Sequence, residues 1–245
     1  MPLSMKRAAR ALLEGAGYQI QKYDVYSSQK LRRRLLFSRL KIDLVIDVGA
    51  NSGQFAQRCR DSGYEGHILS FEPTSAAHAS LIASAAADPR WNVAERMALG
   101  ASTGEVNINI AANSFSSSIL PMLDSHRSAA PHSSYLYIEK APLRRLDDVL
   151  STPAGAHNIF LKLDVQGFES QVLAGAVQTL SRALAVQLEM SLVPLYDGEV
   201  LIQQMCAEMC RLGFDLWDLE PSFRDPATGR LLQVDGVFTR DTTRL

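Results

Sequence analysis

Hydrophobic residues along the chain gather in short runs, separated by stretches in which apolar and polar residues recur with a helical period. The first run, IDLVIDV at residues 42–48, is apolar almost throughout, as is typical of a strand buried on both faces of a parallel sheet. Similar runs predict strands at 67–73, 91–99, 158–164 and 183–191. Strands and helices that alternate in this way favour right-handed crossovers, so the pattern predicts an α/β domain built on a parallel sheet.

Helices are predicted in the intervals between these strands. The helix after the first strand would place Phe55 and Cys59 on one side, and an alanine-rich helix follows at about 74–87. Two more are predicted, one that begins near Phe168 and one at about 199–212.

The rhythm changes in the middle of the chain. Residues 104–111 alternate like an exposed strand, 135–143 are strand-like again, and RRLDDVL after them predicts a short helix. Between the two strands, residues 113–134 are polar and predict a long loop; such loops in compact domains are usually functional or mobile. Toward the C-terminus, runs at 214–220 and 232–240 predict a hairpin at the edge of the sheet.

The composition is ordinary for a soluble globular protein with one sizeable domain: 245 residues, of which 47% are hydrophobic and 21% charged. No run approaches the roughly 20 apolar residues that a transmembrane helix requires, and the N-terminus lacks the apolar core of a signal peptide. Three cysteines are an odd number for a disulfide framework and suit a reducing compartment. We therefore expect a cytoplasmic protein.

Positive charge is concentrated near the N-terminus. Residues 1–41 contain ten Lys or Arg and two acidic residues, although the net charge of the whole chain is −1. The densest part, 29–41, is predicted to be a helix with Leu31, Leu35 and Leu36 on one face and arginines opposite.

Two interpretations of this basic segment remain open. It is a solvated helix docked by its leucines, which we favour, or it contacts an anionic membrane through residues 29–41 and makes the protein membrane-peripheral. Nucleic acid is not expected as a partner, because no platform of aromatic residues accompanies the charge. In either case we expect residues 1–41 to form a helical cap on a domain that spans 42–245.

The loop after the first strand is suited to close approach of a ligand. It lies in LVIDVGANSGQF, residues 44–55, where Gly49 suits a tight turn with positive φ and Gly53 suits close packing of the following helix. Ligands of doubly wound sheets bind beyond the carboxyl ends of the strands. The spacing is Gly-x-x-x-Gly, not the G-x-G-x-x-G of dinucleotide sites. Asp47, before the first glycine, favours a ligand with positive charge or several donors.

A second acid, Glu72, ends the second predicted strand about 20 residues after the glycine turn, where an acid can accept the ribose hydroxyls of an adenosine. An adenosine ligand with cationic groups in place of a diphosphate is S-adenosylmethionine, which has an ammonium and a sulfonium. Asp47 and Glu72 together therefore predict S-adenosylmethionine as the cofactor.

Four stretches of the chain resemble the FkbM-type family of class I, Rossmann-like S-adenosylmethionine-dependent methyltransferases: LVIDVGANSGQF, SFEP, LRRLDDVL and IFLKLDVQGFESQVLAGA. The resemblance covers about residues 42–240. It implies a seven-stranded, mostly parallel sheet with an antiparallel last strand and helices on both faces. It also implies O-methylation of a hydroxyl on a small molecule, such as a sugar of a glycolipid or a polyketide-type metabolite.

The family pattern also implies roles for individual residues. Asp47, Gly49, Asn51 and Gly53 would line the methionine part of the cofactor. Glu72 would contact the ribose, and Met97 and Ala98 would lie near the adenine. The chain departs from the pattern at Gln166, where the family's D-V-E-G-x-E commonly has glutamate. The candidate cofactor site as a whole comprises Asp47, Gly49, Asn51, Ser52, Gly53, Phe55, Glu72, Pro73, Met97 and Ala98.

Methyl transfer to oxygen requires an aligned donor and acceptor and a group that takes the hydroxyl proton. In LKLDVQGFE, Lys162 and Asp164 lie on one face of a strand, with Asp164 at its carboxyl end. We predict Asp164 as the general base or the anchor of the substrate hydroxyl, and Lys162 as the group that holds this carboxylate or the substrate. A structural ion pair between the two is the alternative interpretation.

Further acids lie within reach. Glu189, at the end of the neighbouring strand, is the third catalytic candidate, and Glu169 is a supporting partner. Asp164 and Glu189 could bind Mg²⁺ through oxygen ligands or position sugar hydroxyls without a metal. Because Gln166 removes one carboxylate, we favour a site without metal and assign no metal ligand.

Residues elsewhere offer weaker candidates. His126 and His132 could act as base if the polar loop closes as a lid, although loop histidines are more often solvated. The hydroxyls of SFSSSI at 114–119 could donate to cofactor or substrate. Cys206 and Cys210 lack the further ligands of a zinc site, so we expect core thiols.

Two other functions are weighed against methyl transfer to a small hydroxylated acceptor. An NAD-dependent Rossmann oxidoreductase is disfavoured by the missing third glycine and by Asp47. A catalytically silent, methyltransferase-like binding module is disfavoured by the presence of Asp47, Glu72, Lys162 and Asp164.

Overall fold

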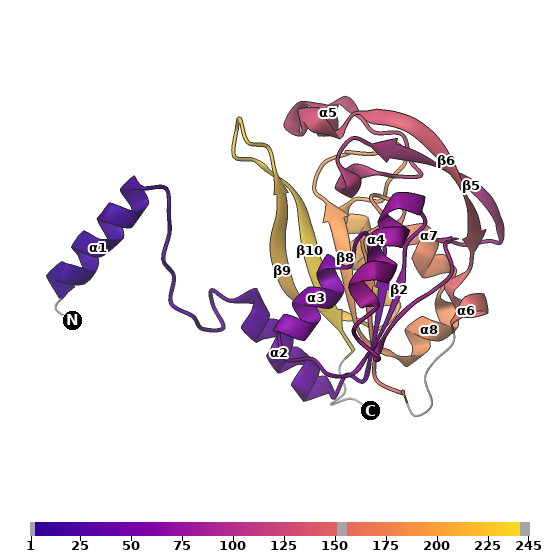
Figure 1. Cartoon of the computed structure of the whole chain (residues 1–245), viewed down its shortest axis with the longest axis horizontal. Helices are drawn as coiled ribbons and strands as arrows, with labels where there is room; N and C mark the ends of the chain where they lie inside the picture. Colours follow the sequence, from indigo (N-terminus) through magenta and orange to yellow (C-terminus); the bar gives the residue numbers. More distant parts are fainter. Residues whose placement is uncertain (1–2, 151–155, 241–245) are drawn as a thin grey trace.

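The computed structural model describes residues 3–150 and 156–240 of the chain. A seven-stranded sheet runs through its centre in the order β3-β2-β1-β7-β8-β10-β9 (Figure 1). Its strands are β1 (Leu44–Val48), β2 (His67–Phe71), β3 (Trp91–Val93), β7 (Ile159–Leu163), β8 (Ala183–Ser191), β9 (Asp215–Arg224) and β10 (Leu231–Thr239).

Strands β3, β2, β1, β7 and β8 run parallel, and β10 runs antiparallel to both of its neighbours. The predicted fold class, a mostly parallel Rossmann-like sheet with an antiparallel last strand, is confirmed. The predicted C-terminal hairpin is present as well: β9 forms the sheet edge, and β10 inserts between β9 and β8.

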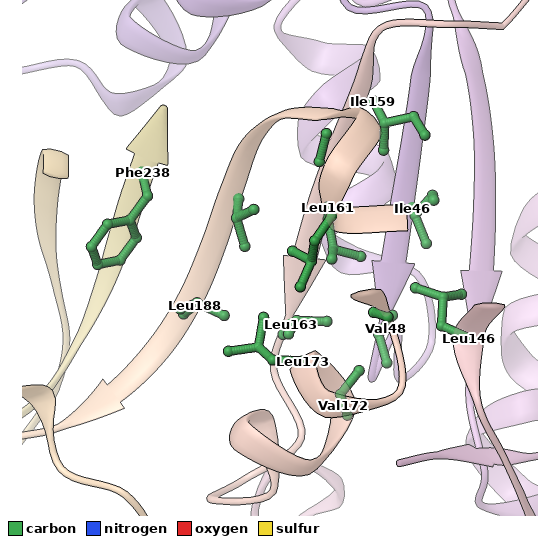
Figure 2. Packing of buried hydrophobic residues seen from close by; sticks show 14 of the residues in the cluster. Ile46, Val48, Leu146, Ile159, Leu161, Leu163, Val172, Leu173, Leu188 and Phe238 are labelled. Atoms are coloured by element: carbon green, nitrogen blue, oxygen red, sulfur yellow. The ribbon is translucent and has the colours of Figure 1, made fainter. Parts of the chain in front are cut away.

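Alternation along the strands gives the sheet two buried faces. On one face Val45 lies beside Ile68 and Phe160, and on the other Ile46 lies beside Leu161. Figure 2 shows Ile46 and Leu161 packed in the core of this second face. Since both faces are apolar, such a strand shows a continuous hydrophobic run in the sequence.

Helices cover both faces of the sheet. Those that share a core with Val45 and Phe160 are α2 (Gln29–Leu40), α3 (Gln54–Asp61) and α4 (Ser75–Ala85). Those that pack around Ile46 and Leu161 are α6 (Leu146–Val149), α7 (Glu169–Ala174), α8 (Val177–Arg182) and α9 (Ile202–Arg211).

Helix α1 (Leu3–Gly15) stands away from the body of the protein at the end of an extended segment (Figure 1). Within residues 3–150 and 156–240, no helix combines the length and the apolar character needed to cross a membrane.

Helix α2 turns a different face to the body than the leucine pattern predicted. Leu36 is buried together with Phe37 and Leu40, whereas Leu35 is 53% exposed. Arg32 also faces the body, where its guanidinium pairs with two acids of β9 at 2.6 and 2.9 Å. The predicted division into a leucine face and an arginine face is therefore wrong, because the acids of β9 attract an arginine to the inner side.

A second, smaller sheet has the order β4-β6-β5. Its strands are β4 (Ala98–Leu99), β5 (Gly104–Ala111) and β6 (Tyr135–Arg144). The single strand predicted at 91–99 is therefore wrong, since β3 ends at Val93 and the chain passes into the other sheet. Between them, Arg96 donates hydrogen bonds to the Pro73 carbonyl and to Glu139 on β6, which ties the crossing to the small sheet.

The segment predicted as a long polar loop contains regular structure. Bridges between Asn109 and Ser118 and between Met122 and Tyr196 attach it to β5 and to the chain after β8. Met122 and Tyr196 are buried in a small core of their own, so the scattered apolar residues of this segment suffice to order it. Its elements are the 3₁₀ helices η1 (Ser114–Ser116) and η2 (Pro131–Ser133) and the helix α5 (Asp124–Ala129).

Candidate active site

A cavity of about 460 Å³ opens at the carboxyl ends of β1, β2, β7 and β8. The strand order reverses here, because β1 has β2 on one side and β7 on the other. The chain between β5 and α5 adds part of the wall. The predicted site residues that line the cavity are Gly49, Asn51, Phe55, Glu72, Pro73, Met97, Ala98, Lys162, Asp164 and Glu189.

Gly49 allows the turn after β1 to approach the end of β7. Its φ is +73°, and an added Cβ would lie 1.8 Å from the carbonyl oxygen of Asp164. The backbones are also joined directly, since the Asp164 N–H donates to the Val48 carbonyl at 3.1 Å. Only glycine permits this contact, and the contact sets the predicted base beside the turn.

Three predicted cofactor residues, Asp47, Ser52 and Gly53, lie outside the cavity wall. Gly53 has a φ of +98°, and an added Cβ would lie 2.5 Å from the ring of Trp91. Because Gly53 has no side chain, the start of α3 can pack against Trp91. Close packing of this helix is the role that the sequence predicts for Gly53.

Glu72 links the turns that follow β1 and β2. It is buried, and its carboxylate accepts the backbone N–H of Asn51 at 2.9 Å and both the N–H and the hydroxyl of Thr74, at 2.9 and 2.6 Å. Burial raises the pKa of Glu72, and the hydrogen bonds from Thr74 and Asn51 oppose that rise. The carboxylate thus fixes the shape of the cavity wall in which it stands.

Asp47 lies behind the wall. Its side chain is fully buried, and Lys162 Nζ lies 3.1 Å from its Oδ1. Burial raises the pKa of Asp47, and the charge of Lys162 acts in the opposite direction. Asp47 does not reach the cavity, so it can affect a ligand there only through neighbouring residues such as Lys162.

The ammonium of Lys162 is held by three acceptors. They are Asp47 at 3.1 Å, Asp164 Oδ2 at 3.3 Å and the Gly49 carbonyl at 3.2 Å. Burial alone would lower the pKa of Lys162, but the carboxylates of Asp164 and Asp47 outweigh it and the net shift is upward. Lys162 is therefore the counter-charge of both carboxylates and donates a hydrogen bond to the glycine turn.

Asp164 and Glu189 come together as predicted. The side chain of Asp164 is 33% exposed in the cavity, and both acids accept a hydrogen bond from the same Gln166 amide nitrogen, at 2.9 and 2.5 Å. Burial, followed by the charges of Asp164 and Asp235, raises the pKa of Glu189 well above its ordinary value. The site thus combines a partly exposed acid, Asp164, with a buried acid, Glu189, whose pKa is raised.

The other candidates lie elsewhere. Glu169 is buried and accepts the Val165 N–H at 2.9 Å, and burial raises its pKa to about 7. His126 is buried against Tyr196 and outside the cavity wall, and His132 is exposed and also outside it, so neither is placed as the predicted base.

The two helical cysteines differ from each other in exposure. Cys206 packs against the core, whereas Cys210 is exposed, so the prediction of a core thiol is wrong for Cys210. Within the described residues, no group of three or more His, Cys, Asp or Glu side chains could hold a metal ion.

Some lining residues had not been predicted. Arg58 on α3, Ser222 on β9 and Asp235 on β10 stand in the cavity wall. Burial and the charge of Asp164 raise the pKa of Asp235 to about 6. An acid inside the apolar run LQVDGVF was the signal that could have identified Asp235.

Residues 47–216 match the family model of the methyltransferase FkbM domain. The chain belongs to the FkbM methyltransferase family. It is 27% identical over 205 residues to the 2-O-methyltransferase NoeI of Sinorhizobium fredii (strain NBRC 101917 / NGR234). The matched region covers 80% of this chain and 79% of that relative.

Two solved structures are similar to this FkbM methyltransferase in the arrangement of the chain. Magnesium protoporphyrin IX methyltransferase of Synechocystis PCC 6803 gives a TM-score of 0.46 at 10% identity, over 98% of this chain and 99% of that one. Fibrillarin of Aeropyrum pernix gives a TM-score of 0.42 at 12% sequence identity, over 84% of this chain and 74% of that one.

Gly49→Ala should destabilise this FkbM methyltransferase by about 3 kcal/mol or more in urea unfolding, because the methyl group overlaps a backbone oxygen in addition to the strain of positive φ. Gly63→Ala is the matched control. Gly63 also has a positive φ, +86°, but no atom lies within 4 Å of its added Cβ, so a loss of about 1 kcal/mol is expected. Equal losses of unfolding free energy in the two variants would show that the close approach of Gly49 to the Asp164 backbone does not exclude a side chain at position 49.

Lys162→Met should cost on the order of 3–5 kcal/mol of unfolding free energy, since it leaves the buried carboxylate of Asp47 without a counter-charge. Adding Asp47→Asn should recover part of that loss, because the amide needs no counter-charge. Lys140→Met, at an exposed lysine of β6, is the control and should change stability by less than about 0.5 kcal/mol. If denaturant unfolding gave the same small effect for Lys162 and Lys140, the buried ion pairs would not stabilise the fold.

Proposed function

We propose that the chain transfers a methyl group from S-adenosylmethionine to a hydroxyl of a small, sugar-containing acceptor. One observation carries the proposal: the partly exposed carboxylate of Asp164 stands in the same cavity as the glycine turn and Glu72. Membership of the FkbM family supports methyl transfer, and the similarity to a protein named a 2-O-methyltransferase supports oxygen as the acceptor atom. Family membership also disfavours the NAD-dependent oxidoreductase.

The cavity suits the cofactor in shape and chemistry. Gly49 and Asn51 would lie along its methionine part, Glu72 would accept from its ribose, and Met97 and Ala98 would flank its adenine. S-adenosylmethionine supplies a methyl carbon already activated by a sulfonium. The protein has mainly to bind and align donor and acceptor and to exclude water.

Asp164 is proposed as the general base. An alcohol is a poor nucleophile, so a positioned group must take its proton as it attacks the methyl carbon. The side chain of Asp164 reaches the cavity, and the ammonium of Lys162 holds one of its oxygens at 3.3 Å. Glu189, whose pKa burial raises, stands beside Asp164 and could donate a hydrogen bond to a second oxygen of the acceptor when its carboxyl group is protonated.

A polyhydroxylated acceptor fits the remaining wall. Its polar groups include Arg58, Ser222 and Asp235, and Phe115 is 63% exposed among them. Sugar hydroxyls pair with such acids, amides and guanidiniums, and a phenyl ring packs against the apolar face of a sugar. A sugar of a glycolipid or of a polyketide-type metabolite is the class that we propose.

Asp164→Asn tests this function directly. With a panel of sugar-containing acceptors and radiolabelled cofactor, the substitution should lower the turnover number by about 10²–10⁴-fold, the usual contribution of a general base. The affinity for S-adenosylhomocysteine should stay within about 3-fold. Asp61→Asn, at an exposed acid of α3, should match the wild type.

Unchanged turnover in Asp164→Asn would exclude Asp164 as base. Tight binding of S-adenosylhomocysteine with no transfer by the wild-type protein to any hydroxylated acceptor would favour the silent binding module instead.

We further propose that the enzyme works in the cytoplasm at an anionic membrane surface and that the exposed basic residues of α2 contribute to the contact. Since Arg32 and Arg33 face the body, Lys30, Arg34 and Arg39 are the residues of this helix that remain available. Apolar and aromatic side chains before α2 are also exposed: Leu12, Tyr18, Ile20, Tyr23, Val25 and Tyr26. Basic charge beside exposed aromatic groups is the composition of an interfacial segment.

Vesicles that contain phosphatidylglycerol should bind the protein, and binding should weaken as salt rises. Arg34→Gln combined with Arg39→Gln should reduce the affinity about 30-fold, at about 1 kcal/mol for each charge. The matched control, Arg224→Gln with Arg230→Gln on the β9–β10 hairpin, should leave it unchanged. Equal binding to neutral vesicles, or equal losses in both double variants, would contradict the proposal.

A further inference from the structure

Gln166 stands between the two acids of the site and the segment that closes the cavity. It follows β7 with a φ of +55°, in the left-handed region that a non-glycine residue rarely adopts. Its carbonyl accepts the Ser118 hydroxyl at 2.7 Å. The backbone of Gln166 is therefore linked to the segment that carries η1, independently of the contacts of its side chain.

The side-chain amide of Gln166 has three partners and one possible orientation. Its Nε2 donates to Asp164 Oδ1 at 2.9 Å and to Glu189 Oε2 at 2.5 Å, and its Oε1 accepts the hydroxyl of Tyr196 at 2.7 Å. Rotation of the amide by 180° would set its oxygen against two carboxyl oxygens. Both amide hydrogens are thus committed, one to each acid.

The acids that the amide joins lie in a crowded electrostatic environment. Glu189 accepts a second hydrogen bond from Gln233 on β10 at 3.2 Å. Any carboxylate placed between Asp164 and Glu189 would meet several charges of the same sign and one cation. The titratable groups that face this point are Lys162 of β7, Asp164 directly after it, Glu169 of α7, Glu189 of β8, Tyr196 and Glu199 after β8, and Asp235 of β10.

We propose that Gln166 is the positioning residue of the site: its amide fixes the distance between Asp164 and Glu189 and holds both acids toward the acceptor. This inference rests on the proposed function, because it assigns the two acids to the acceptor end of the cavity. Tyr196 orients the amide, and Ser118 couples the same residue to the wall of the cavity. In this chain the amide supplies two donors without adding charge, at a position where the family's pattern commonly has glutamate.

Two substitutions separate the donor role from simple filling of space. Gln166→Leu removes both donors at every pH, so the turnover number should fall at least tenfold while KM for S-adenosylmethionine changes less than threefold. Gln166→Glu keeps one donor while its carboxyl group is protonated and loses it on ionisation, when it also repels Asp164. Its turnover relative to the wild type should therefore fall at least tenfold between pH 5 and pH 9.

Two further variants serve as controls. Gln203→Glu, on the exposed side of α9, makes the same chemical change away from the site and should give a ratio to the wild type that is flat with pH. Tyr196→Phe removes only the hydroxyl that orients the amide and should lower the turnover number less than Gln166→Leu does. If Gln166→Leu does not fold, the pH dependence of Gln166→Glu still decides the test. Wild-type turnover in Gln166→Leu, or a flat ratio for Gln166→Glu, would overturn the proposal.

A second readout needs no acceptor. In protein labelled with carboxyl-¹³C glutamate, with the Glu189 signal assigned through Glu189→Gln, Gln166→Leu should raise the Glu189 midpoint by about one pH unit because an N–H donor is lost. A shift below about 0.3 units would overturn the positioning role even if the enzyme methylates a sugar. The expected shift in a protein that methylates nothing would instead reject the proposed function alone.

Discussion

A buried lysine joins the parts of the protein on which the site depends. The ammonium of Lys162 lies between Asp47 and Asp164 and donates to the carbonyl of Gly49. Removing Lys162 and Asp47 from water is costly, and the attraction of the ammonium for the two carboxylates offsets that cost. The ends of β1 and β7 are thereby held together, with the glycine turn after one and Asp164 after the other.

Polar contacts extend this arrangement to the cavity wall. Glu72 binds the backbone of Asn51, whose side-chain amide donates to the Ser114 carbonyl at 3.0 Å. On the other side, Gln166 links the acids at the ends of β7 and β8 to Ser118. The chain after β5 is therefore fastened to strand ends at two points. These contacts hold in place the segment that forms part of the cavity wall.

The central strands could be predicted from the sequence, because a strand buried on both faces leaves a continuous apolar run. The position of Gly49, Glu72 and Asp164 in one cavity could also be predicted, because the carboxyl ends of parallel strands meet at one edge of the sheet. What the sequence could not predict depends on long-range contacts. The inward side of α2 is selected by acids of β9, about 190 residues away. Asp235 joins the site only because β10 inserts beside β8. The burial of Asp47 depends on its ion pair with Lys162, which lies more than 100 residues away and so leaves no sign in the sequence around the glycine turn.

Calorimetric titration would decide whether this cavity binds S-adenosylmethionine. Protein freed of copurified ligand would be titrated with S-adenosylmethionine, S-adenosylhomocysteine and NAD⁺. We expect binding of one equivalent of each adenosyl ligand at micromolar concentration and no heat with NAD⁺. Folded protein that binds neither adenosyl ligand would contradict this expectation, and the family's fold would then be present here without its chemistry.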